Sequence, residues 1–169
     1  QIPRLDRELE EGLGEGGQFA SIAPFPRMGQ WSGGDRDGNP FVVAETLDYA
    51  IRAQGALAFE HYLDEVHQLG SELSLSARLV RPTPALLQLA VDGQDTNPHR
   101  QDEPYRQALT GIYARLAATT LALTGRTSAR HPHAQLNPYA TPEEFAADLE
   151  AIRASLVTHG AAILATRRL

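Results

Sequence analysis

Prolines at predicted helix starts, each followed by apolar residues at helical spacing, restrict this chain to a helical fold. The pairs Thr83-Pro84 and Glu103-Pro104 and the run Thr141–Glu144 all have this form. Proline is favoured at the first helical position because its missing N–H would have no partner there. In the third run, Thr141 and Glu144 also form a capping box, with the glutamate reaching back to the first free amide. No segment alternates polar and apolar residues with period two, as a half-buried strand would. The sequence therefore predicts an all-α fold.

The apolar spacing predicts one helical fragment spanning residues 1–169. We expect a short helix over 1–13, a long loop over 14–43, and helices over 44–169 with loops near 76–82, 93–102 and 125–140. The chain begins with Gln1 and its apolar pattern runs to Leu169 without a glycine stop, which predicts an excerpt from a longer polypeptide. The helical stripes that should face a core comprise Leu47, Ala50, Ile51 and Ala58, then Phe59, Tyr62, Leu63, Val66, Leu69 and Leu73, then Tyr105, Ala108, Leu109, Ile112, Leu116 and Leu123, and finally Phe145, Leu149, Ile152, Leu156 and Ile163.

Composition excludes several classes of function. The chain has no cysteine and no lysine, and all 15 basic residues are arginine. Thiol nucleophiles, cysteine-bound zinc, Schiff bases and a phosphate-loop lysine are therefore impossible within these residues. The net charge of −6 argues against a nucleic-acid partner. No apolar run is long enough to span a membrane, so no membrane partner is expected.

Residues 29–40 carry the most distinctive signal: they read Gly-Gln-Trp-Ser-Gly-Gly-Asp-Arg-Asp-Gly-Asn-Pro. The glycines allow positive φ and close approach to a ligand, and an arginine between two aspartates favours a braced loop. Asp35, Asp37 and Asn39 have the opening spacing of a calcium loop, but Pro40 and Thr46 stand where glycine and a bidentate glutamate are needed. A calcium-binding module and a free-standing helical interaction domain remain the alternatives.

This string resembles the Trp-x-Gly-Gly-Asp-Arg-Asp-Gly-Asn-Pro signature of the phosphoenolpyruvate carboxylase family. The stretch from Ile2 to Leu13 resembles the helix before that signature, and residues 71–74 and 103–106 resemble two later family stretches. Two positions depart from the family pattern, with Ser32 in place of methionine or isoleucine and Val43 in place of a capping threonine. The resemblance implies a helical segment excised from a larger, helix-rich (β/α)-barrel enzyme.

The family converts phosphoenolpyruvate and bicarbonate to oxaloacetate and phosphate with Mg²⁺ or Mn²⁺. By resemblance, Trp31 forms a wall of the substrate pocket, and the loop scaffold that braces it comprises Gly33, Gly34, Asp35, Arg36, Asp37, Gly38 and Asn39. The resemblance also implies a cytoplasmic homotetramer. The fragment itself should bind no metal and should be inactive, and it is expected to self-associate through exposed apolar patches.

The family's catalytic histidine lies in a Thr-Ala-His-Pro-Thr stretch that this chain lacks, since residues 130–133 share only the His-Pro pair. The arginine-glycine loop, active-site lysine and metal ligands of the family are also absent, so no catalytic residue is expected. His61 and His67 are six apart and should lie on the surface or be partly packed. His131 and His133 stand in a loop without a nearby acidic residue, and His159 is expected at a rim. Tyr105 is expected in the core, with Arg106 extending to water.

Overall fold

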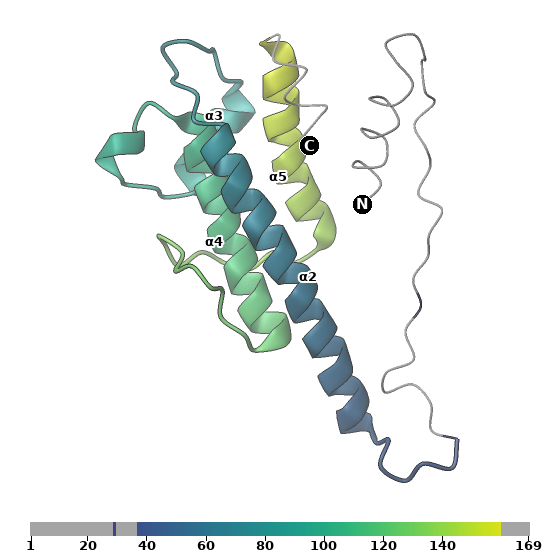
Figure 1. Cartoon of the computed structure of the whole chain (residues 1–169). Helices are drawn as coiled ribbons and strands as arrows, with labels where there is room; N and C mark the ends of the chain where they lie inside the picture. Colours follow the sequence, from purple (N-terminus) through teal and green to yellow (C-terminus); the bar gives the residue numbers. More distant parts are fainter. Residues whose placement is uncertain (1–28, 30–36, 160–169) are drawn as a thin grey trace, which may run out of the picture. The chain divides into compact units, whose positions relative to one another are not determined.

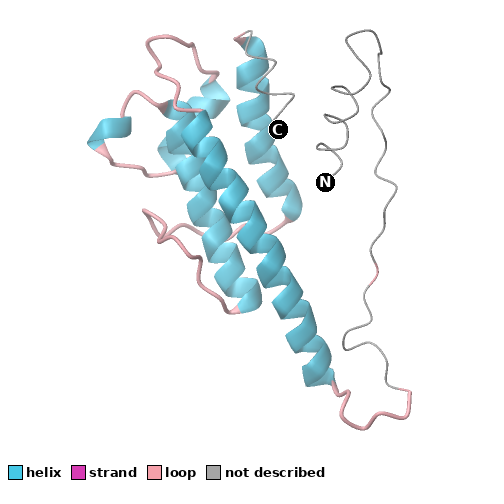
Figure 2. Ribbon diagram, viewed as in Figure 1, coloured by secondary structure: helices cyan, strands magenta, loops and turns pink. Residues whose placement is uncertain are grey.

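The computed structural model describes residue 29 and residues 37–159, and only helices and loops occur in this part (Figures 1 and 2). The chain divides into two units, residues 1–42 and residues 43–169. All the described helices belong to the second unit. The expected helix over 1–13 and Ile163 lie outside the described residues. The prediction of an all-α fold is confirmed for the described part.

In the described part of the second unit, four α-helices and one short 3-10 helix follow one another. None of the helices in the described ranges is both long and apolar enough to cross a membrane. Their bounds are α2 (Ala44–Glu72), α3 (Pro84–Asp92), η1 (Pro98–Arg100), α4 (Pro104–Thr124) and α5 (Pro142–Thr158).

Local chemistry explains where the helices begin. The Thr83 and Thr141 hydroxyls accept hydrogen bonds from amides three residues later, which satisfies N–H groups that have no partner inside the helix. The carboxylate of Glu144 accepts from the Ala140 amide at 3.3 Å, one residue earlier than a standard capping box requires. Val43 has no capping side chain; instead the Thr46 hydroxyl accepts from the Val43 amide at 3.4 Å.

Helix α4 is the centre of the core. It packs against α2 and α3 and also contacts α5. Leu63, Val66 and Leu69 of α2 are buried, as are Ile152 and Leu156 of α5. Tyr105 is completely buried at the start of α4, and its hydroxyl lies 2.7 Å from Ser155 Oγ of α5. The Thr83 amide donates to the same oxygen at 3.1 Å. One buried serine thus links α4, α5 and the start of α3, and the prediction of a core tyrosine is confirmed.

Two glycines allow α3 and α4 to approach closely. A Cβ atom added to Gly111 would stand 2.5 Å from the Cα atom of Gly93, closer than real Cβ atoms come to any backbone atom. At Gly55, in contrast, there is room for a Cβ atom, because it would lie 3.5 Å from Thr124 Cγ2, an ordinary van der Waals contact. Gly55 therefore lies beside the end of α4, without the crowding found at Gly111.

Helix α2 extends past the end of α4, as the lower part of Figure 1 shows. The guanidinium of Arg52 donates to the Leu123 carbonyl at 3.3 Å, so α4 ends opposite Arg52. The first two turns of α2, residues 44–51, are named the α2 overhang. Leu47 and Ile51 lie there and are 37% and 57% exposed, so the expectation that their stripe faces the core is wrong. It fails because α4 is too short to reach them.

The expectation that Leu123 is buried is also wrong, because its side chain is 59% exposed. Helix α5 runs antiparallel to α4 and begins opposite Thr119, where the Tyr139 amide bonds the threonine hydroxyl just before α5 starts. Leu123 therefore lies one turn beyond the last residue of α4 that this end of the bundle covers.

Candidate functional site

The described end of the glycine-rich segment is a tight turn. Gly38 has φ +73°, a conformation that side chains with a Cβ rarely adopt. The Asn39 side-chain oxygen accepts from the Phe41 amide at 3.0 Å, and the Asn39 carbonyl accepts from the Val42 amide at 3.3 Å. These bonds form an Asx turn that ends the segment just before α2.

The structure reaches only part of the predicted site. Trp31, Gly33, Gly34, Asp35 and Arg36 lie outside the described residues. Asp37, Gly38 and Asn39 are described and all three are exposed. The pocket role of Trp31 and the bracing role of the loop therefore stay predictions.

The described residues show no metal centre. Within residues 29 and 37–159, no three His, Asp or Glu side chains lie close enough together to hold an ion. His133 Nε2 instead lies 2.7 Å from the Gly93 carbonyl oxygen. His61 and His67 are exposed, as expected, and His67 packs edge-on against Tyr113.

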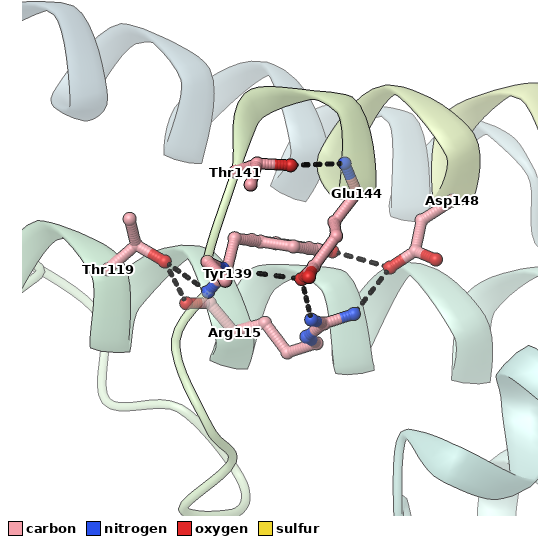
Figure 3. Close-up of polar contacts among 7 residues, drawn as sticks. Arg115, Thr119, Tyr139, Thr141, Glu144 and Asp148 are labelled. Carbon is pink, nitrogen blue, oxygen red and sulfur yellow. Dashed lines mark hydrogen bonds and ion pairs between the residues drawn. The ribbon is translucent and has the colours of Figure 1, made fainter.

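A polar cluster that the sequence analysis did not find joins α4 to α5 (Figure 3). The Arg115 guanidinium donates to the carboxylate of Glu144 at 2.9 Å and to that of Asp148 at 3.1 Å. It also lies over the Tyr139 ring, 3.9 Å from the centroid. The Tyr139 hydroxyl donates to Asp148 at 2.7 Å, and its amide donates to Thr119 Oγ at 2.9 Å.

The electrostatics of this cluster keep Tyr139 protonated. Burial raises the pKa of the phenol well above its ordinary value, and the hydrogen bond to Asp148 and that carboxylate's charge raise the pKa further. The nearby Arg115 charge opposes this shift and is the weaker influence. Because Arg115 of α4 pairs with Glu144 and Asp148 of α5, and Tyr139 bonds the same Asp148, these residues hold the two helices together and are named the clamp.

The sequence contains one signal that could have indicated the clamp. Arg115 interrupts the apolar run Ile112–Leu116 near the face of α4 that carries the core, and an arginine in that place needs a partner. Its partners lie 29 and 33 residues away in sequence, on a helix whose position no local pattern gives. Only the packed structure identifies them.

A cavity of about 190 Å³ lies between α2, η1, α4 and the loop over 125–140. Three arginines line it, Arg106 among them. Each has a carboxylate within 3.2 Å: Arg100–Asp95, Arg106–Glu103 and Arg130–Asp64. The charge of these guanidinium groups is thus compensated within the fold. The side chain of Arg106 is 38% exposed, which agrees with its expected extension to water.

Comparison with known proteins gives the family. The family model of phosphoenolpyruvate carboxylase matches residues 1–169. The phosphoenolpyruvate carboxylase of Burkholderia mallei (strain SAVP1) is 49% identical over 176 residues, and that of Azoarcus sp. (strain BH72) is 49% identical over 173 residues. The Rhodopseudomonas palustris enzyme of the same name is 46% identical over 175 residues. No solved structure matches the chain at a significant level.

The chain belongs to the phosphoenolpyruvate carboxylase family, as the glycine-rich segment predicted. All of this chain is covered in each comparison, but it spans only 18% of the Burkholderia protein and 19% of the other two. The described helices therefore correspond to a small part of these proteins.

Proposed function

We propose that this chain is a segment of a phosphoenolpyruvate carboxylase, which converts phosphoenolpyruvate and bicarbonate to oxaloacetate and phosphate. The observation that carries the proposal is the family match over residues 1–169, together with 49% identity to a relative of that name. The segment supplies one wall of the substrate pocket, and other parts of the enzyme supply the catalytic groups.

The reaction explains why such a wall is needed. Bicarbonate attacks the phosphorus atom, the bond from phosphorus to the enol oxygen breaks, and carboxyphosphate and pyruvate enolate result. Carboxyphosphate then releases CO₂ and phosphate, and the enolate carbon attacks CO₂ to form oxaloacetate. Water that reaches the enolate would protonate it to pyruvate, so the site must be dry.

Trp31 is our candidate for the surface that excludes this water. A large indole on a glycine-rich loop offers a flat apolar face beside the substrate methylene. The neighbouring charged residues Asp35, Arg36 and Asp37 brace the loop. The turn over Gly38 and Asn39 supports this proposal, because it anchors the described end of the segment directly before a long helix.

The Mg²⁺ or Mn²⁺ of the family polarises the substrate's oxygen atoms when it is bound. The described residues do not fit it, since no group of three ligating side chains occurs among them. From the family resemblance, we place the metal ligands, the catalytic histidine and the active-site lysine outside this chain. The full enzyme is proposed to be a cytoplasmic homotetramer.

A chimera tests the proposal. The 169 residues would replace the matching segment of the Burkholderia mallei relative, and oxaloacetate would be measured by its reduction with a coupled dehydrogenase. The chimera should carboxylate phosphoenolpyruvate, whereas the isolated chain should produce no oxaloacetate. Activity of the isolated chain, or an inactive but folded chimera, would contradict the proposal.

Substitution of Trp31 in the chimera tests its role. Trp31→Ala should increase the fraction of phosphoenolpyruvate that ends as pyruvate, because the enolate meets water. Trp31→Phe keeps an apolar ring and should retain most of the carboxylation. An unchanged ratio of pyruvate to oxaloacetate in Trp31→Ala would exclude the indole as the water barrier.

A further inference from the structure

The α2 overhang exposes apolar side chains on more than one side of a helix. Leu47 is 37% exposed, Ile51 is 57% exposed and Tyr49 is 71% exposed. At 100° per residue, Leu47 and Ile51 share one face and Tyr49 lies roughly opposite. A helix that is apolar on opposed faces is typical of one enclosed by other protein rather than one lying on a surface.

Within the second unit, the described helices leave the overhang uncovered. The end of α4 contacts α2 at Arg52, which bonds the Leu123 carbonyl, and at Gly55, which approaches Thr124. The overhang therefore lies beyond the reach of its main packing partner, as Figure 1 shows.

The size of the overhang argues against a second copy of this chain as its cover. Eight helical residues form a cylinder about 12 Å long and 10 Å wide, with a lateral area of roughly 380 Å². A stable interface between separate proteins needs roughly 800 Å² from each partner. A segment of the same polypeptide needs much less area, because its association does not cost the freedom of a separate molecule.

We propose that the α2 overhang is an intrachain docking surface, covered in the full-length protein by polypeptide outside residues 1–169. The relatives supply such polypeptide, since this chain spans only 18% of the Burkholderia protein. The inference rests on the proposed function, namely that the chain acts as a segment of a protein of that length. The overhang also directly follows the glycine-rich segment in sequence, so its docking fixes one end of that segment to the rest of the enzyme.

Hydrogen exchange tests whether the α2 overhang is covered in the larger protein. Backbone amides of residues 47–51 would be followed by mass spectrometry in the isolated chain and in the chimera with the Burkholderia mallei relative. Burial of one large apolar side chain stabilises a helix enough to slow exchange by roughly ten- to a hundredfold, so the chimera should show protection of that order. Equal exchange in both proteins would overturn the proposal. If the amides of the overhang are already protected from exchange in the isolated chain at all concentrations, a segment within the 169 residues covers it. If that protection disappears on dilution, a second copy of the chain covers it. Either result overturns the proposal.

A substitution gives an independent test. Ile51→Ser should lower the melting temperature of the chimera by more than it lowers that of the isolated chain. Val91→Ser is the matched control, because Val91 is an exposed β-branched residue of α3, 71% exposed and outside the overhang. It should shift both proteins equally. An equal effect of Ile51→Ser in the two proteins would refute docking at this surface.

Failure of this inference is distinguishable from failure of the proposed function. An unmodified chimera that folds but makes no oxaloacetate contradicts the proposed function, whereas exchange at the overhang is read without activity. If the chimera does not fold, exchange over the matching helix start of the unmodified Burkholderia mallei protein replaces it. Rapid exchange there would overturn the docking proposal.

Discussion

Replacement of Gly111 by alanine gives the sharpest test of the packing described above. The new Cβ would stand 2.5 Å from the Cα of Gly93, whereas ordinary contacts begin near 3.4 Å. The obstructing atom belongs to the backbone at the end of α3, so no side chain can rotate away. Helices α3 and α4 must separate by roughly 1 Å, and overpacking of this kind costs about 1–3 kcal/mol, occasionally more.

Two opposing effects set the net change. Alanine stabilises a helix interior by about 1 kcal/mol relative to glycine. We place the clash at the upper end of its range, about 3 kcal/mol, because the contact is backbone to backbone. Gly111→Ala should therefore destabilise the chain by about 2 kcal/mol, which lowers the melting temperature by roughly 4–8 °C for a chain of this length.

Gly55→Ala is the matched control. Its Cβ would meet Thr124 Cγ2 at 3.5 Å, an ordinary contact, so only the helix preference should act. That variant should be stabilised by about 1 kcal/mol. Both variants would be measured by thermal and urea unfolding, followed by circular dichroism at 222 nm. The two glycines should thus respond with opposite signs. A Gly111→Ala variant as stable as Gly55→Ala would refute the close approach of α3 and α4.

Three further predictions concern the clamp and the cap. Arg115→Met should destabilise the chain by about 2 kcal/mol in urea unfolding, because it leaves the half-buried Asp148 without its cation. Arg115→Lys should recover only part of this stability. Full recovery would show that the simultaneous pairing of one guanidinium with Glu144 and Asp148 is unimportant. Thr141→Ala should lower the free energy of unfolding by about 1 kcal/mol, because it removes the cap of α5. Thr127→Ala, in an exposed loop, should leave the stability unchanged. Equal effects of the two substitutions would contradict the capping role of Thr141. The raised pKa of Tyr139 means that folding favours the neutral phenol. Its contribution to the free energy of unfolding is therefore complete below pH about 10 and is lost as the pH rises above that value. Tyr139→Phe should flatten this alkaline decline, and an unchanged decline would show that Tyr139 does not cause it.

Local sequence signals were sufficient for the helix starts and for the family. Thr83-Pro84 and Thr141-Pro142 carry their own capping oxygens, and these bonds form between residues three apart. The glycine-rich segment is equally local, because its identity depends on residue order alone. Within the described part, the turn at Gly38 agrees with the glycine preference that its positive φ imposes.

What the sequence alone determined is therefore where the described helices begin and which family the chain belongs to, since both depend on neighbours along the chain. The tertiary structure decided which apolar stripes are buried. Leu47, Ile51 and Leu123 have the spacing of core residues, yet they are exposed because the facing helices end before reaching them. It also decided the partners of Arg115, because a charge is compensated by whatever lies within a few ångströms, and folding brings residues 29 and 33 positions away to that place.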